Sequence, residues 1–242
     1  MRALRILLIV VVILGGLFVL VDRVAVHFAE GEAADKLKAT QNLADTPDVS
    51  IEGFPFLTQV ASGSLDDVHV GIKDYEAATG QSGRTIRIDD LQADMKGVDF
   101  SGDYSSATAS TATGSALISY AELMKAAQFK TTDIIPGVTA LVTGLSDGGN
   151  GKIKVAVNLK TPLGTQTVSV LSSVTVDDDR IQVHADSLPK AVVDFAESKV
   201  RSVTDFRQTV GQLPGGIKLD TVRAAKDGVR ITVRGSHVEL AG

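Results

Sequence analysis

An unbroken apolar run near the N-terminus constrains this chain more than any other feature. Residues Ile6 to Val21 contain no charged side chain, and Arg2 and Arg5 precede them. As an α-helix the run is about 24 Å long, slightly less than the ~30 Å hydrocarbon core of a bilayer. Leu4 and the aliphatic part of Arg5 extend it. Positive charge before an apolar segment is typical of a cytoplasmic N-terminus, so we predict a membrane helix with everything after Asp22 outside.

A cleaved signal peptide is the alternative interpretation of the same run. Such a peptide usually has a shorter apolar region that ends at a small-x-small cleavage site. Here Asp22 and Arg23 follow the run directly, and the nearest such triplets come late, at residues 29–31 and 31–33. This spacing favours an uncleaved anchor in the plasma membrane, with secretion after cleavage as the alternative.

The remaining composition suits one folded extracytoplasmic domain. We predict a cytoplasmic stub and anchor over residues 1–22 and this domain over residues 23–242. Hydrophobic residues make up 44% of the chain and charged residues 22%, which allows a packed core. The net charge of −5 disfavours nucleic acid as a partner. The absence of cysteine excludes disulfides, thiolate metal sites and cysteine nucleophiles.

The clearest strand pattern lies between Val138 and Ala185. Apolar residues alternate with lysine and asparagine from Ile153 to Leu159, and the alternation returns between Val168 and Val176. This period of two predicts half-buried strands with one wet face. A glycine-rich turn at residues 148–151 and a Thr-Pro-Leu-Gly turn at residues 161–164 connect them, so an antiparallel meander is expected.

Residues 23–43 are predicted by propensity to form a helix that continues from the membrane segment as a stalk or packs on the domain. Two further helices are predicted in the domain. Ser119 and Glu122 form a capping box before a short helix over residues 120–128. A longer apolar stripe at helical spacing runs from Val192 to Leu213, with a break near Thr204-Asp205 as an open alternative. The expected fold is α+β: a strongly curved antiparallel β-sheet wrapped around this long amphipathic helix, preceded by the N-terminal transmembrane helix.

Catalytic and metal-binding patterns are weak. The segment Gly144-Leu145-Ser146-Asp147-Gly148 matches GxSxG, but a nucleophile elbow needs a helix after the serine, and a glycine turn follows here. The four histidines are scattered without ligand spacing, and Asp177–Asp179 lacks the spaced ligands of a calcium loop. We therefore expect no enzyme activity, no metal and no cofactor.

A dense apolar cluster, Phe54-Pro55-Phe56-Leu57, follows Gly53. It is interpreted either as a plug at the end of the core or as a membrane-facing tip, since exposed apolar patches mark interaction surfaces. The stretch from Asp48 to Gln59, with the strand around Val68-His69-Val70, resembles the signature of the LmeA-like phospholipid-binding family. The segments at residues 213–217 and 227–229 resemble that family's C-terminal pattern.

The resemblance implies an exported envelope protein that binds anionic phospholipid in a fold similar to tubular lipid-binding domains, with no catalytic residue carried over. We expect a lipid carrier, presenter or sensor at the outer face of the plasma membrane, with an envelope glycolipid enzyme as a candidate partner. An anchored scaffold that recruits such an enzyme is the alternative, and a hydrolase using Ser146 is a third hypothesis. The candidate lipid-lining residues are Phe54, Phe56, Leu57, Met95, Phe100, Phe129, Phe195 and Phe206.

Overall fold

The computed structural model describes residues 2–78, 85–102, 106–127, 130–177, 180–186, 205–209 and 216–241. The described chain is α+β and mostly strands, with a curled antiparallel sheet and a long N-terminal apolar helix, which confirms the predicted fold class. By compactness it divides into two units, and each is described by itself. The first comprises Met1–Ile72, Gln92–Thr113 and Gly235–Gly242, and the second comprises Lys73–Leu91 and Gly114–Arg234.

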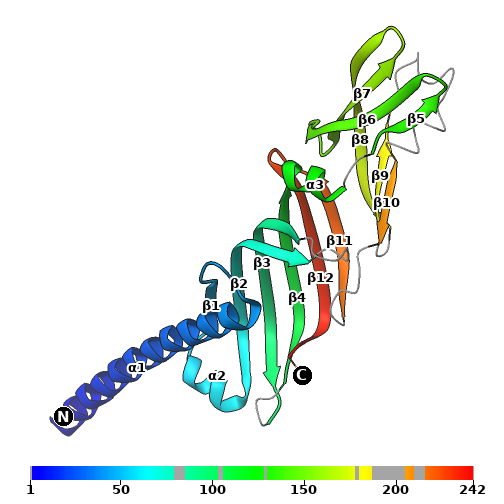
Figure 1. Ribbon diagram of the computed structural model, residues 1–242. Helices are drawn as coiled ribbons and strands as arrows, with labels where there is room; N and C mark the ends of the chain where they lie inside the picture. The colour runs from blue at the N-terminus through cyan, green and yellow to red at the C-terminus, as the bar shows by residue number, and fades with distance from the viewer. Residues whose placement is uncertain are drawn as a thin grey trace. The chain divides into compact units, whose positions relative to one another are not determined.

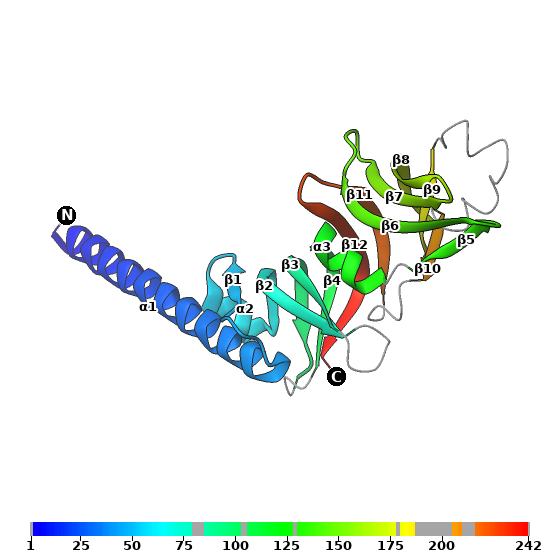
Figure 2. The same ribbon diagram turned by 45° about the horizontal axis from the view of Figure 1, so that its top comes forward.

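Helix α1 (Arg2–Gln41) contains the apolar run and continues far beyond it (Figure 1). The side chains of the run are exposed, and by length and composition this helix could cross a membrane. Its second half carries a buried stripe at Asp22, Val26 and Ala34, which packs on β1 and α2. Figures 1 and 2 both show this half of α1 beside β1 and α2. The first half of α1 is therefore an exposed apolar helix, and the second half is a structural part of the first unit.

The described strands form two six-stranded sheets, in the orders β1-β2-β3-β4-β12-β11 and β10-β9-β8-β7-β6-β5. In the first sheet, β1 pairs antiparallel with β2, with Ile51 opposite Val68. Strands β2, β3, β4 and β12 each contribute residues to both units. The bounds are β1 (Asp48–Glu52), β2 (Ser64–Ala78), β3 (Thr85–Phe100), β4 (Ala107–Ser119), β11 (Ile217–Ala224) and β12 (Gly228–Ala241), with the short helix α2 (Phe56–Ser62) between β1 and β2.

The second sheet is the predicted meander. Its strands are β5 (Thr132–Ile135), β6 (Val138–Asp147), β7 (Ile153–Thr161), β8 (Gly164–Asp177), β9 (Arg180–Ala185) and β10 (Phe206–Thr209). Neighbouring strands pair antiparallel, and Val157 lies opposite both Val142 and Val168. The alternating valines of β7 are buried, as the sequence pattern predicted, because one face of this strand faces the core. The turns at Gly148–Gly151 and Thr161–Gly164 lie where expected.

The core of the second unit gathers apolar residues from both sheets and from helix α3 (Tyr120–Ala127). Close backbone approach also shapes this unit. A β-carbon at Gly228, the first residue of β12, would lie 2.2 Å from the carbonyl oxygen of Ile118. Only glycine therefore fits the start of this strand.

The predicted long helix requires a correction at its C-terminal end. Residues 187–204 and 210–215 lie outside the described residues, but Phe206–Thr209 form β10 rather than a helix. This strand pairs antiparallel with the edge of β9, with Phe206 opposite Val183. Asp205 fixes its start, because its carboxylate accepts the N–H of Ala185 at 3.0 Å and pairs with His184 Nδ1 at 2.8 Å. Pairing with a sheet edge prevails here over local helical periodicity.

Candidate functional site

The signature segment clamps helix α1 to the first unit. Asp22, directly after the apolar run, is fully buried, and its Oδ1 accepts the backbone N–H of Leu57 at 2.9 Å. Leu57 lies in the first turn of α2, whose N-cap residue Pro55 makes no side-chain cap. A carboxylate at this position satisfies a free N–H of the first helical turn and complements the helix dipole. Asp22 therefore caps α2 from another helix and fixes where α1 enters the domain.

The two phenylalanines of this segment have different surroundings. Phe56 is only 7% exposed and packs with Val26 of α1 and with Leu65. Phe54 is 56% exposed, and the Arg23 guanidinium lies 5.2 Å from its ring centroid. That guanidinium also donates to Asp22 Oδ2 at 2.8 Å and to the carbonyl oxygen of Gly53 at 3.3 Å. Phe56 is thus a plug in the core, whereas Phe54 is an exposed tip, so each interpretation of the cluster fits one of the two residues.

Gly53 makes this tight segment possible. Its φ of +104° lies in a region that L side chains rarely adopt, and an added β-carbon would lie 2.4 Å from Gln59 Nε2. Gln59 itself is held by the backbone N–H of Asp66, which donates to Oε1 at 2.7 Å. The glycine of the signature is therefore required by backbone conformation and by close packing.

The second unit contains an open groove of about 800 Å³, within the range of small-molecule sites. Its walls are formed by Ser173–Val176 of β8, Asp220–Ala224 of β11 and the turn at Asn150–Lys152. Val222 belongs to the core of this unit, and Val174 and Val176 pack partly buried against that core. These three valines, from strands that are far apart in the sequence, are the apolar part of a lining that also contains polar side chains such as Thr175 and Thr221, and we call them the floor.

The rim of the groove is charged. Lys152 and Arg223 line it as cations and Asp220 as an anion, and Lys152 Nζ lies 3.0 Å from Asp186 Oδ2. Ser173 Oγ donates to Asp186 Oδ1 at 2.6 Å. This hydrogen bond, with the nearby Lys152, holds the pKa of Asp186 below its usual value although burial opposes the shift. The groove thus combines an apolar part with a rim of mixed charge.

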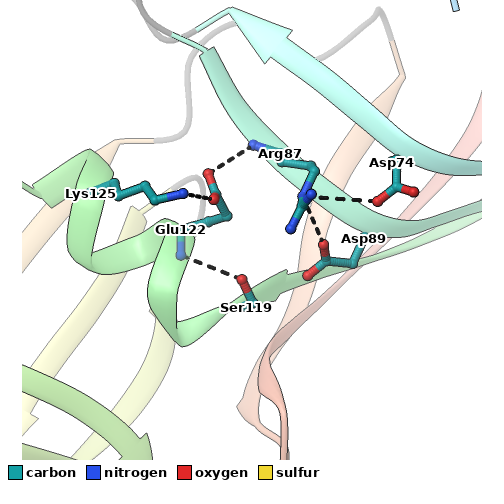
Figure 3. A network of polar contacts seen from close by, with 6 residues as sticks. All are labelled: Asp74, Arg87, Asp89, Ser119, Glu122 and Lys125. Atoms are coloured by element: carbon teal, nitrogen blue, oxygen red, sulfur yellow. Dashed lines mark hydrogen bonds and ion pairs between the residues drawn. The ribbon is translucent and has the colours of Figure 1, made fainter. Parts of the chain in front are cut away.

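A second polar network, shown in Figure 3, is structural. The Ser119 hydroxyl accepts the N–H of Glu122 at 3.4 Å, which confirms the predicted N-cap of α3. The Glu122 carboxylate accepts from Lys125 Nζ at 2.5 Å and from the backbone N–H of Arg87 at 3.5 Å. Arg87 Nε lies 3.3 Å from Asp89 and 3.9 Å from Asp74. The network ties α3 to β3 and leaves Glu122 ionised, with the Lys125 hydrogen bond as the main reason for its lowered pKa.

Tyr120, at the start of α3, also has a structural role. Its hydroxyl donates to the carbonyl oxygen of Ala225 at 2.8 Å. Burial, aided by the negative charges of Asp147 and Asp227, raises its pKa to about 12. A phenol that stays protonated and donates to the backbone fixes the β11–β12 turn against α3.

Acid is expected to destabilise the second unit through the carboxylates of Glu122 and Asp186. The pKa values of Glu122 and Asp186 lie below their ordinary values of 4.5 and 3.8 in the folded chain. Their contribution to the free energy of unfolding is therefore complete above those ordinary values and is lost as pH falls through the lowered ones. Urea unfolding followed by circular dichroism between neutral pH and acid should show uptake of up to about two protons on unfolding.

The double variant Glu122→Gln, Asp186→Asn is the matched control for the pH experiment. It should be less stable than the parent at neutral pH and should lose less further stability on acidification. An unchanged pH dependence in this variant would show that other carboxylates cause the acid transition.

The weak catalytic and metal patterns have local structural explanations. Ser146 lies near the end of β6, and the segment after it is the turn into β7, so the GxSxG match is the predicted hairpin. Asp147 Oδ1 accepts the N–H of Gly149 at 2.8 Å, as an Asx turn does. Within the described ranges no group of three or more metal-ligating side chains lies close together. Two of the histidines instead pair with single carboxylates: His69 Nδ1 lies 2.7 Å from Asp94, and His184 Nδ1 lies 2.8 Å from Asp205.

None of the five lining candidates whose side chains are described, Phe54, Phe56, Leu57, Met95 and Phe100, lines the groove. Four of them, Phe56, Leu57, Met95 and Phe100, belong to the core cluster around Val26 in the first unit. Phe54 is exposed beside Arg23, Phe129 and Phe195 lie outside the described residues, and Phe206 is described only by its backbone in β10. Sequence reasoning missed the groove residues Val174, Val176 and Val222 as site residues, although the alternation of β8 marked its two valines as inward-facing.

A β-rich domain with an open groove lined in part by valines, together with an N-terminal apolar helix, fits the class of lipid-binding proteins. Comparison with protein families agrees with this class. The model of the LmeA-like phospholipid-binding family matches residues 20–234, most of the chain, so the protein belongs to that family. The matched region contains the Asp22 clamp, the signature segment and both walls of the groove. No curated protein and no solved structure shows a significant match.

Proposed function

We propose that this protein binds anionic phospholipid in the groove of the second unit, at the outer face of the plasma membrane, as a carrier, presenter or sensor in envelope lipid metabolism. Membership of a phospholipid-binding family supports the ligand class. The observation that supports the location of the site is that Val174, Val176 and Val222 line the same groove as the cations Lys152 and Arg223. We place the acyl chain on the floor and the phosphate at the rim.

The energetics of lipid transfer favour such a floor. Removing an acyl chain from the bilayer forfeits about 0.8 kcal/mol per methylene, which a binding protein must return through apolar contact. An acyl chain of about 20 Å matches about six residues of extended strand. Strands β8 (Gly164–Asp177) and β11 (Ile217–Ala224) are both longer than this. At the rim, Lys152 or Arg223 would donate a charge-assisted hydrogen bond to the phosphate of any phospholipid. The preference for anionic lipids would come from their net charge, because the same cations would repel the choline of a zwitterionic headgroup.

The burial of α1 supports an uncleaved anchor. Cleavage after either late small-x-small triplet, at residues 29–31 or 31–33, would remove Asp22 and Val26 from the first unit. Asp22 caps α2 and Val26 belongs to the core, so the domain would lose part of its own structure. With Arg2 and Arg5 before the run, the positive-inside rule favours a domain outside the cytoplasm.

Photocrosslinking in the membrane tests the proposed site. The full-length chain is reconstituted in vesicles that contain phosphatidylglycerol with a photoactivatable group on the acyl chain, and the labelled peptides are mapped by mass spectrometry. We expect labelling of α1 from the bilayer and, in addition, of residues 173–176 and 220–224 from bound lipid. The same probe built on phosphatidylcholine should label the groove less. Labelling of α1 alone would exclude the groove as the lipid site and would favour a scaffold that recruits an envelope enzyme.

A further inference from the structure

Helix α1 carries an exposed apolar stripe beyond the predicted membrane run. Val24 is 69% exposed and Phe28, one helical turn later, is 74% exposed. Both lie away from the buried stripe of Asp22, Val26 and Ala34 that packs on the domain. Large apolar side chains with this exposure, continuous with a lipid-exposed segment, mark an interaction surface.

The length of the helix indicates what covers this stripe. The run from Ile6 to Val21 is about 24 Å long and falls short of a ~30 Å hydrocarbon core. From Leu4 to Val24 the helix rises about 30 Å, so the core would extend to Val24. Phe28 then lies about 6 Å further along the axis. This depth falls within the headgroup layer, because a bilayer with its headgroups is about 40–45 Å thick.

The charged residues at this depth are accommodated by the clamp. The Asp22 carboxylate is fully buried in the protein and accepts the N–H of Leu57, so it is not exposed to lipid. The Arg23 guanidinium is paired with Asp22 and lies over the exposed ring of Phe54. An arginine whose long side chain carries its charge outward along an aromatic ring suits the boundary between acyl chains and headgroups.

We propose that Val24, Phe28 and Phe54 form a foot that inserts into the boundary between headgroups and acyl chains of the bilayer. The inference rests on the membrane anchoring proposed above. Because α1 runs without interruption from the apolar run into the first unit, no flexible linker separates the foot from the membrane. The exposed half of the family signature would then contact lipid while the buried half holds the anchor.

Depth-dependent fluorescence quenching tests the foot. The chain contains no cysteine, so one introduced thiol carries an environment-sensitive fluorophore at a unique site. The full-length variants Val24→Cys, Phe28→Cys and Phe54→Cys are reconstituted in vesicles of phosphatidylcholine and phosphatidylglycerol. Nitroxides near the headgroup or deep on the acyl chain serve as quenchers. Leu14→Cys, in the middle of the run, reports insertion of the anchor. Ala39→Cys, exposed on α1 about 16 Å beyond Phe28, is the aqueous control.

We expect the labels at residues 24, 28 and 54 to be quenched several-fold more by shallow nitroxides than the label at residue 39, while the label at residue 14 is quenched by deep nitroxides. If residue 14 is quenched but residues 28 and 54 behave like residue 39, the foot is refuted and the anchor stands. If residue 14 is not quenched by either lipid, the anchor is refuted and the foot with it.

Discussion

Val174→Asp is expected to reduce acyl-chain photocrosslinking of β8 and β11 about 30-fold or more, while crosslinking of α1 stays unchanged. Val174 packs partly buried on the groove floor, where a bound chain would cover it. A carboxylate there must be desolvated or protonated before the lipid can bind, and a penalty of about 2 kcal/mol already corresponds to about 30-fold in affinity. The crosslinked fraction, measured by mass spectrometry over a range of lipid probe concentrations, gives the loss.

Ser169→Asp is the matched control for this variant. Ser169 lies on the same strand, exposed on the face opposite to the inward valines, so the same charge is added without touching the floor. Circular dichroism melts of both variants establish that the second unit is folded. Val176→Asp provides a second disruption of the floor. Unchanged crosslinking in folded Val174→Asp and Val176→Asp proteins would remove the groove as the acyl-chain site.

The sequence predicted those parts of the fold that local pattern determines. The alternation from Ile153 to Leu159 specified both the strand and its buried face, because one side of β7 faces the core. The Ser119 cap predicted α3, since its hydroxyl bonds three residues along the same chain. In the predicted capping box the Glu122 carboxylate would also accept the backbone N–H of Ser119, and this hydrogen bond is not formed. Glu122 bonds instead to Arg87, a neighbour that only the folded sheet brings close.

Long-range contacts could not be predicted in the same way. A charged pair after an apolar run, as in Asp22-Arg23, is typical of an exit into water, yet Asp22 is buried because it meets the first turn of α2. Phe206 follows a helical stripe in the sequence but lies in a strand, because the edge of β9 offers hydrogen bonds that the stripe does not reveal. The groove joins Val174 and Val222 from strands far apart in the sequence.

These contacts also assign different tasks to the apolar residues of the signature. The segment from Gly53 to Leu57 lies in the first unit, and the groove residues lie in the second. Phe56 packs on Val26 and Leu57 bonds to Asp22, so these two residues hold the anchor helix. The densest part of the resemblance that pointed to lipid binding is therefore a segment that attaches the domain to its helix. Phe54 is the exception, because its ring is exposed.

Phe56→Ala is expected to destabilise the first unit by about 3–5 kcal/mol, the usual cost of truncating a buried phenylalanine. The variant would leave a cavity among Val26, Leu65 and Val98, where helix α1 joins the domain. Such a loss is a large part of the stability of an ordinary domain. Hydrogen exchange of the full-length chain in vesicles, followed by mass spectrometry, should show amides of α2 and β1 exchanging about 100-fold faster or more.

Phe54→Ala separates this structural role from contact with the membrane. Phe54 lies two positions before Phe56 but is exposed. Its truncation should change the stability of the first unit by no more than about 0.5 kcal/mol, as ordinary surface substitutions do, and the amides of α2 and β1 should exchange nearly as slowly as in the parent protein. The first half of α1 should stay protected in both variants because the bilayer shields its amides. Equal acceleration in the two variants would contradict the division of the signature into a buried plug and an exposed tip. Loss of protection in Phe56→Ala alone would show that the buried ring of Phe56 is needed to hold the anchor helix against the domain.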